Sequence, residues 1–229
     1  MIKLTKKAMP TVLKDNADKW LQELKIKLSV LDTLDKKSDE YKKKKKEIIA
    51  SQGKYNHPDV KSVLRAETHD KCAYCEGVVT DVGYGDIEHI SPKVSDVDRT
   101  FDWSNLGFSC PVCNRKKAIV ESGEIVDPYT QDPTPYIQFC GHIASSNGNA
   151  KGWKTIQLLG LNRTELVQSR IQVYNSVMGE LEVIKIQSDL SVKNAMVENF
   201  VEEHLSPTRE FSAMRASLWK YFGLSDFEQ

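Results

Sequence analysis

Apolar residues recur at intervals of three and four along several stretches of this 229-residue chain. The first such group lies near the N-terminus and consists of Trp20, Leu21, Leu24, Leu28 and Leu31. Because a helix turns every 3.6 residues, this spacing puts the group on one face of an amphipathic helix. It predicts a helix over about residues 12–34. The five consecutive lysines at residues 42–46 fit the exposed face of a second helix.

The same periodicity predicts helices over about residues 58–68, 164–184 and 192–204, and another after Pro207. Thr164 is a suitable N-cap for the helix that follows it. The residues expected on the apolar faces of these helices are Val60, Val63, Leu64, Leu166, Tyr174, Val177, Met178, Leu181, Phe211, Met214, Leu218 and Phe222. We interpret these faces as hydrophobic core.

Short extended segments interrupt the helical pattern in the middle of the chain. A turn at Gly83 and Gly85 leads into a strand at about residues 86–90, and a second strand spans about residues 106–109. A helix begins near Pro111, since proline is well tolerated at the first helical position. The order strand, strand, helix is therefore expected within this central segment.

The segment between this region and the C-terminal helices is rich in proline and polar residues. A third strand is expected at about residues 136–139, and a polar loop at about residues 145–152. Cys140 has no partner at a regular spacing and is expected to be a small buried apolar residue. Together the patterns predict an α+β fold that is mostly helical.

The composition, with 40% hydrophobic and 28% charged residues, is that of an ordinary soluble protein. The longest apolar runs fall well short of the 18 residues of a membrane-spanning helix, so none is expected. The first ten residues carry charge but lack the apolar segment of a secretory signal peptide. These features predict a cytoplasmic protein whose thiols stay reduced.

The formal net charge is zero, but it is unevenly distributed. Residues 1–71 contain 18 Lys and Arg against 11 Asp and Glu, whereas residues 72–229 contain 14 against 21. The basic part is compatible with contacts to phosphates, and the acidic part with a protein partner. Solvated helix faces explain the same distribution, and charge alone favours that simpler interpretation.

Two Cys-x-x-Cys pairs, Cys72/Cys75 and Cys110/Cys113, frame the centre of the sequence. Each such turn brings two thiolates to one tetrahedral Zn²⁺, and two turns complete a closed structural site. A closed site has no position for a catalytic water, so we expect this zinc to join the two ends of the segment. Two disulfides or redox-active thiols are the alternative, which a reducing compartment disfavours.

A carboxylate, a histidine and an amide accompany the cysteine pairs, namely Glu88, His89 and Asn114. Phosphodiester hydrolysis needs a base to activate water and positive charge near the leaving 3′ oxygen. Histidine titrates near neutrality, and a carboxylate with an amide oxygen suits a hard divalent ion. Arg115 and Lys117 follow in the predicted helix and are candidates for binding flanking phosphates. The other histidines have no such setting and are interpreted as structural: His57, His69, His142 and His204.

These residues resemble the HNH endonuclease family, whose fold is the ββα-metal motif. The family pattern is matched at residues 72–75, 88–92, 105–106 and 110–117. The resemblance implies that His89 is the general base that activates water, and that Asn105 braces the loop presenting it. It also implies that Glu88 and Asn114 ligate the catalytic Mg²⁺ or Mn²⁺, while the four cysteines hold Zn²⁺.

Two positions depart from the pattern of many family members, which have Asp or His in place of Glu88 and His in place of Asn114. An amide oxygen favours Mg²⁺ or Mn²⁺ over the softer Zn²⁺ or Ni²⁺. Glu is one methylene longer than Asp, which leaves open whether Asp86 shares the catalytic metal.

Further short motifs resemble the PtuB-type branch of the family. They lie at residues 72–76, 88–93, 103–106, 126–128, 159–163 and 211–213. Proteins of that branch accompany the ATPase PtuA in Septu and some retron anti-phage systems. The resemblance implies an effector nuclease acting on DNA or RNA with an ABC-type ATPase partner. In retron systems a reverse transcriptase and its RNA–DNA hybrid would join them.

Two other functions were weighed against this interpretation. A non-catalytic zinc-knuckle module that only binds nucleic acid or protein has no need of a base beside a hard-metal ligand pair. An HNH restriction or homing enzyme acting alone needs a DNA-reading domain, and the sequence shows neither a second zinc finger nor net positive charge. We therefore divide the chain into a helical region (1–70), an HNH nuclease core with a four-cysteine zinc site (71–130) and a mainly helical region (131–229).

Overall fold

The computed structural model describes residues 1–79, 83–118, 120–121 and 123–224. Its α-helices are α1 (Thr11–Asp32), α2 (Asp39–Gln52), α3 (Pro58–Thr68), α4 (Pro111–Lys117), α5 (Ala150–Leu159), α6 (Thr164–Ile186), α7 (Leu190–His204) and α8 (Ser212–Tyr221). The strands are β1 (Asp86–His89), β2 (Leu106–Ser109), β3 (Gln138–Cys140) and β4 (Ile143–Ser145). Short 3₁₀ turns are η1 (Gly53–Tyr55), η2 (Val97–Arg99) and η3 (Trp103–Asn105). The predicted mostly helical α+β fold is confirmed.

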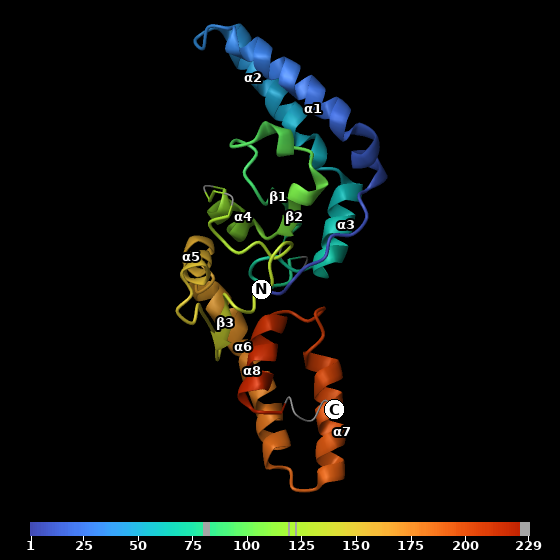
Figure 1. The fold of residues 1–229 in the computed structure, drawn as a ribbon, viewed down its shortest axis with the longest axis vertical. Coiled ribbons are helices and arrows are strands. Elements are labelled where there is room, and N and C mark those ends of the chain that lie inside the picture. Colours follow the sequence, from blue (N-terminus) through green and yellow to red (C-terminus); the bar gives the residue numbers. More distant parts are fainter. Residues whose placement is uncertain (80–82, 119, 122, 225–229) are drawn as a thin grey trace.

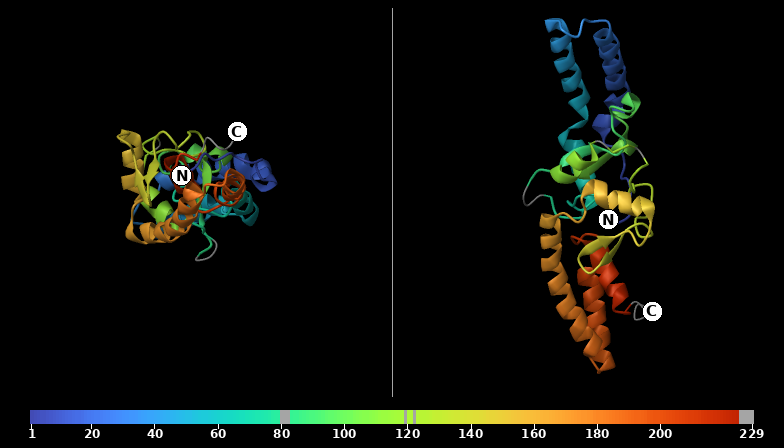
Figure 2. Two further views of the ribbon diagram at one scale, coloured as in Figure 1. Left: turned by 90° about the horizontal axis from the view of Figure 1, so that it is seen from below. Right: turned by 90° about the vertical axis from the view of Figure 1, so that its left-hand side faces the viewer.

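The molecule is elongated, and its parts follow one another along the long axis (Figures 1 and 2). The hairpin of α1 and α2 projects at one end. The β1–β2 ribbon lies in the middle with α3 and α4, and the helices α6, α7 and α8 form the other end. Helical elements therefore flank the central ribbon on both sides along the long axis.

The N-terminal hairpin is held together by a small apolar cluster between its two helices. Leu24 of α1 and Ile48 of α2 are buried against Phe101, which belongs to the loop between β1 and β2. Ser38 caps α2 by accepting a hydrogen bond from the Tyr41 backbone N–H. The lysine run lies within α2, so its predicted helical conformation is confirmed.

The central unit has the predicted order of strand, strand and helix. β1 and β2 pair antiparallel, with Asp86 opposite Ser109 and His89 opposite Leu106. α3 packs against both strands, and α4 packs against β1. Pro58 and Pro111 occupy the first positions of these helices, where no backbone donor is lost. The expected bounds of α3 and β2 agree with the structure, and β1 ends one residue earlier than expected.

Gly85 enters β1 with φ +59°, a conformation that a side chain disfavours. A Cβ at this position would also collide with the ring of Phe108, which is fully buried. Residues 83–85 lead into β1 without an assigned turn, and residues 80–82 before them lie outside the described residues, so the predicted turn at Gly83 and Gly85 stays a prediction.

The segment after the central unit differs from the sequence prediction. The expected strand begins two residues late, and β4 and α5 occupy half of the predicted polar loop at 145–152. Asn149 caps α5 through its side chain, which accepts from the Gly152 N–H. Cys140 is exposed on β3, so its predicted burial was wrong.

The three C-terminal helices are present as predicted. Thr164 is the first residue of α6 and not its N-cap; Arg163 holds that position, without a side-chain cap. The apolar faces pack into the main core, with Val177, Leu181 and Met214 fully buried. Among the described helices, none combines the length and the apolar character needed to cross a bilayer.

Candidate active site

The four cysteines converge at the end of the central ribbon. Their sulfur atoms all lie within 4.8 Å of one another, and the Cys75 and Cys110 sulfurs are 4.0 Å apart. Metal–sulfur bonds of about 2.3 Å in a tetrahedral site place neighbouring sulfurs about 3.8 Å apart. The predicted cluster therefore has the dimensions needed to hold one metal ion. No histidine belongs to it among the described residues.

Glu88 is a buried carboxylate on β1, with 3% of its surface exposed. It accepts a hydrogen bond from the Tyr74 hydroxyl, and its other oxygen lies 3.4 Å from the Lys117 ammonium. Burial raises the pKa of Glu88, and the positive charge of Lys117 opposes that shift. Burial and the nearby Glu88 charge raise the pKa of Tyr74, so its hydroxyl keeps the proton that it donates.

His89 ends β1 and is half-buried. Its Nε2 lies 2.9 Å from the carbonyl oxygen of Thr100, which only accepts hydrogen bonds, so Nε2 carries the proton. Burial lowers the pKa of His89 to about 4, which keeps the imidazole neutral at pH 7. The remaining nitrogen, Nδ1, then holds a lone pair. The ring also packs edge-on against Tyr55, with ring centres 4.6 Å apart.

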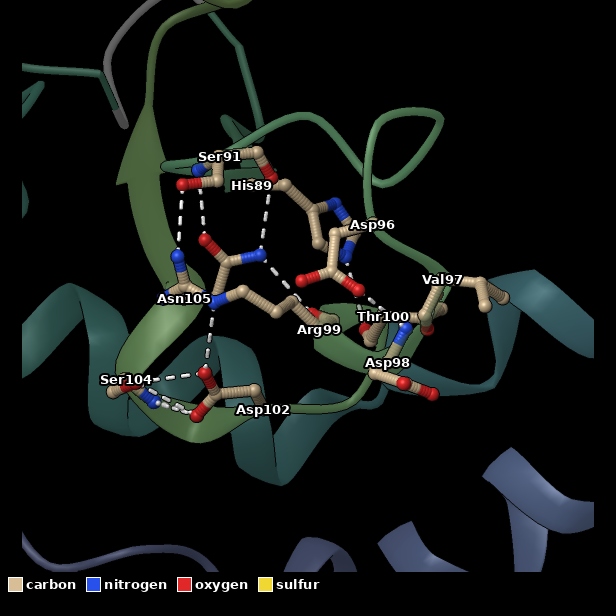
Figure 3. A network of polar contacts seen from close by, with 10 residues as sticks. All are labelled: His89, Ser91, Asp96, Val97, Asp98, Arg99, Thr100, Asp102, Ser104 and Asn105. Carbon is tan, nitrogen blue, oxygen red and sulfur yellow. Dashed lines mark hydrogen bonds and ion pairs between the residues drawn. The ribbon is translucent and has the colours of Figure 1, made fainter. Parts of the chain in front are cut away.

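Asn105 joins the two ends of the loop that follows His89 (Figure 3). Its side-chain oxygen accepts from the Ser91 N–H at 2.7 Å, and its amide donates to the carbonyls of Ser91 and Arg99 at 3.0 Å each. Asn105 is fully buried. It therefore fixes the loop between His89 and Thr100. The carbonyl of Thr100 accepts the hydrogen bond from His89 Nε2.

Asn114 contacts a different carboxylate from the one that the family pattern suggests. Its side-chain amide donates to Asp86 at 3.0 Å, while Glu88 is bonded to Tyr74 and Lys117. Asp86 and Glu88 share one face of β1, and α4 runs along that face. Asn114 therefore lies beside Asp86, and Lys117, three residues further along α4, lies beside Glu88.

Arg115 and Lys117 have different environments although they are two residues apart. Arg115 is exposed on α4. Lys117 is 3% exposed, and its ammonium donates to the carbonyls of His89 and Ile90 at 2.6 Å each. The expectation that Lys117 binds a flanking phosphate is corrected, because its donors are used inside the protein to hold the end of β1.

Sequence reasoning missed several residues around the site. Tyr74 lies inside the first Cys-x-x-Cys turn, and Tyr55 and Thr100 are far from His89 in sequence. Their contacts with Glu88 and His89 depend on tertiary packing, for which the sequence carries no periodic signal. The spacing of Asn114 and Lys117 on one helix face was the available clue to the buried role of the lysine.

Residues 72–118 match the family model described as HNH endonuclease. The chain contains an HNH domain. The domain includes both cysteine pairs, the β1–β2 ribbon and α4. Its strand–strand–helix order and cysteine cluster agree with the predicted ββα core.

Two curated relatives share a longer similarity with the chain. One is Septu protein PtuB of Bacillus mycoides (strain KBAB4), 28% identical over 177 aligned positions, with 62% of this chain and 59% of that protein covered. Another is Septu protein PtuB of Bacillus thuringiensis, 28% identical over 132 residues, covering 56% of this chain and 51% of that protein. The chain thus matches little more than half the length of these relatives. The predicted resemblance to PtuB-type HNH proteins is confirmed.

Proposed function

We propose that the protein is a metal-dependent endonuclease that hydrolyses phosphodiester bonds in nucleic acid. The observation that carries this proposal is His89, a neutral histidine whose Nε2–H is anchored on Thr100 and whose Nδ1 retains a lone pair. His89 acts as the general base toward water, and Asn105 and Lys117 position it through the loop and the β1 end. Arg115 is exposed and contributes to phosphate binding.

The hard-metal ligands in this proposal are Asn114 and the carboxylates on the same face of β1. Asp86 touches Asn114, which supports its inclusion, and Glu88 lies two residues further along the strand. Oxygen donors of this kind suit Mg²⁺ or Mn²⁺, and such an ion supplies positive charge for the leaving 3′ oxygen. The four cysteines hold a separate structural Zn²⁺, since their donor set is all thiolate.

Asn114→Ala should weaken Mn²⁺ binding at least about tenfold, because removal of a ligand costs no less than loss of an outer-shell partner. Isothermal titration with Mn²⁺ measures this directly, without reference to cleavage. Asp86→Asn should weaken binding as well. Asn199→Ala, on an exposed position of α7, is the matched control. Unchanged Mn²⁺ affinity in Asn114→Ala would remove this residue from the proposed ligand set.

The proposed biological role is that of an effector nuclease in anti-phage defence, which the similarity to two Septu proteins supports. In this role the chain works in the cytoplasm with a PtuA-like ABC-type ATPase, and in retron settings with a reverse transcriptase and its RNA–DNA hybrid. Residues 71–130 form the nuclease core between the helical regions 1–70 and 131–229. Co-purification with the product of the neighbouring ATPase gene tests the partnership, and its failure would leave the nuclease proposal standing.

The N-terminal hairpin contributes a basic surface to nucleic-acid binding in this proposal. Lys43, Lys45 and Lys46 are exposed on α2, whereas Ile48 of the same helix is buried. The hairpin ends at Tyr55, whose ring packs on His89 and lies 5.3 Å from the Lys93 ammonium. This continuity with the catalytic histidine favours a substrate-binding role over a merely solvated face.

Replacing Lys45 and Lys46 with glutamate should reduce affinity for nucleic acid and flatten its salt dependence. The slope of log affinity against log salt should fall by about one for each lysine that contacts a phosphate. Fluorescence anisotropy with a labelled duplex, in a range of NaCl concentrations, measures both effects. The control is Lys185→Glu with Lys220→Glu, two exposed lysines on α6 and α8, the helices at the other end of the molecule from the hairpin. Equal salt slopes for the two double variants would show that the hairpin is a solvated face.

A further inference from the structure

Arg170 of α6 is a buried cation without a carboxylate partner among the ion pairs of the described residues. Only 1% of its surface is exposed. One guanidinium nitrogen donates to the Leu161 carbonyl at 2.7 Å, while Nε has no hydrogen-bond partner in the part of the chain that the structure describes. Its other neighbours include the rings of Phe139 and Phe211, at 4.9 and 5.7 Å. A buried charge in such a setting is costly unless negative charge lies nearby.

The negative groups that act on Arg170 are the cysteine cluster and Glu76, whose carboxylate is already held by the Met1 ammonium and the Ser212 hydroxyl. Gly77 lies between the cysteine cluster and Phe211, since a Cβ at this position would be 3.8 Å from the Cys75 sulfur and 3.9 Å from the Phe211 ring. The cluster therefore adjoins one of the two rings that contact Arg170. Burial lowers the pKa of Arg170 to about 10, against the opposing effect of charge at Cys75 and Glu76. The guanidinium is thus separated from the cysteine cluster by the Phe211 ring, which adjoins both.

A second arginine reaches the cluster directly. Nη1 of Arg163 is 3.8 Å from the Cys113 sulfur, within the range of an N–H···S contact, and also donates to the Gly160 carbonyl. Arg163 precedes α6 and belongs to the short motif at residues 159–163 that the proposed nuclease chemistry does not use.

The rest of that motif fixes where Arg163 points. Gly160 ends α5 with φ +57°, and a Cβ there would press on the Lys116 side chain. Asn162 exchanges two hydrogen bonds with the backbone of Ala144 on β4, at 2.9 and 2.8 Å. The loop is thus held on both sides, against α4 and against the β3–β4 hairpin.

We propose that Arg163 and Arg170 neutralise the zinc–thiolate centre and thereby fasten α6 to the HNH domain. Four thiolates around Zn²⁺ leave a net charge of −2, and the two guanidinium groups supply the matching +2. This inference rests on the proposed structural zinc. It assigns the motif at 159–163 to metal retention, with both arginines as positioning residues that contact no substrate.

The test is the rate at which folded protein releases zinc to a chelator, followed with a colorimetric zinc indicator. Arg170→Met keeps the length and apolar contacts of the side chain but removes its charge, and zinc loss should become about tenfold faster. Arg170→Lys should stay close to the wild type. Arg163→Gln, at a half-exposed position, provides a second variant should Arg170→Met fail to fold. Arg209→Met, at an exposed arginine paired with Glu203, is the control.

Substitution of Co²⁺ for zinc adds a second measurement, the absorption spectrum of the metal site, which a change in packing alone would not shift. Removing positive charge beside the thiolates raises the energy of the sulfur electrons, so the sulfur-to-cobalt absorption band should shift to longer wavelength in Arg163→Gln and Arg170→Met. Release rates and spectra equal to the wild type in both folded variants would overturn the inference alone. A wild-type protein that contains no zinc would overturn the proposed zinc site as well.

Discussion

His89→Ala should lower the rate of nucleic-acid cleavage at least about 100-fold, the usual contribution of a general base. The imidazole is the titratable group with a free lone pair at the end of β1, and its anchoring on Thr100 leaves Nδ1 as the acceptor. Alanine cannot accept a proton, so water must be activated without help. The measurement is the initial cleavage rate at saturating Mn²⁺ and equal protein concentration.

The same substitution should leave the fold and the zinc content unchanged. His89 is half-buried, and loss of its single backbone hydrogen bond costs about 1 kcal/mol. His142→Ala is the matched control, because His142 packs on Tyr174 and lies outside the HNH domain. An unfolded or zinc-free His89→Ala protein would reverse the assignment, since it would make His89 a structural residue.

Cys110→Ser should lose bound metal and unfold at a markedly lower temperature than the wild type. Zinc binding by such clusters contributes about 10–16 kcal/mol of apparent free energy, and an alcohol is a poor substitute for a thiolate ligand. The Cys110 sulfur also caps α4 by accepting from the Cys113 N–H at 3.4 Å. Zinc content by atomic emission and unfolding by circular dichroism check both consequences.

Cys140→Ser is the control for this experiment, because Cys140 is exposed on β3 and outside the cluster. It should keep its zinc and its unfolding temperature. If Cys110→Ser were as stable as Cys140→Ser, the cluster would contribute no folding free energy and its structural role would have to be abandoned.

Local signals in the sequence were sufficient where proline and apolar periodicity agreed. The start of α3 at Pro58 and the pair of short strands before Pro111 followed from such signals. They failed at α5, where Gly152 was taken as part of a polar loop. In the structure Gly152 lies inside α5, and this position requires glycine because a Cβ would collide with the Tyr136 carbonyl. A glycine required by close packing and a glycine that marks a loop look alike in a single sequence.

The sequence identified most residues of the candidate site, but not which of them contact one another. Cysteine spacing and the Glu-His motif identified the cluster and the end of β1. The partner of Asn114 depends on the rotation of α4 against the ribbon, and this rotation brings it to Asp86. Lys117 is polar in sequence yet buried in the structure, because the carbonyls of His89 and Ile90 need donors at the end of the strand.

The two proposed metal sites have separate tasks, and their ligands come from different parts of the HNH domain. The cysteine cluster fixes the ends of the segment, with Arg163 and Arg170 beside it. Asp86 and Glu88 lie on the face of β1 that α4 covers, and Asn114 faces them from α4. Loss of zinc is therefore expected to act through folding, and loss of the hard ion through chemistry alone.

The most direct test of the central claim is a cleavage assay that also identifies the ends produced. The protein, alone and co-purified with the ABC-type ATPase proposed as its partner, is incubated with plasmid DNA, single-stranded DNA and total RNA in Mg²⁺ or Mn²⁺. We expect products with 5′-phosphate and 3′-hydroxyl ends, because the 3′ oxygen is the leaving group, and no products with EDTA or with His89→Ala. Cleavage that survives His89→Ala, or the absence of cleavage under every combination in zinc-loaded protein, would contradict the assignment of this site as a nuclease centre.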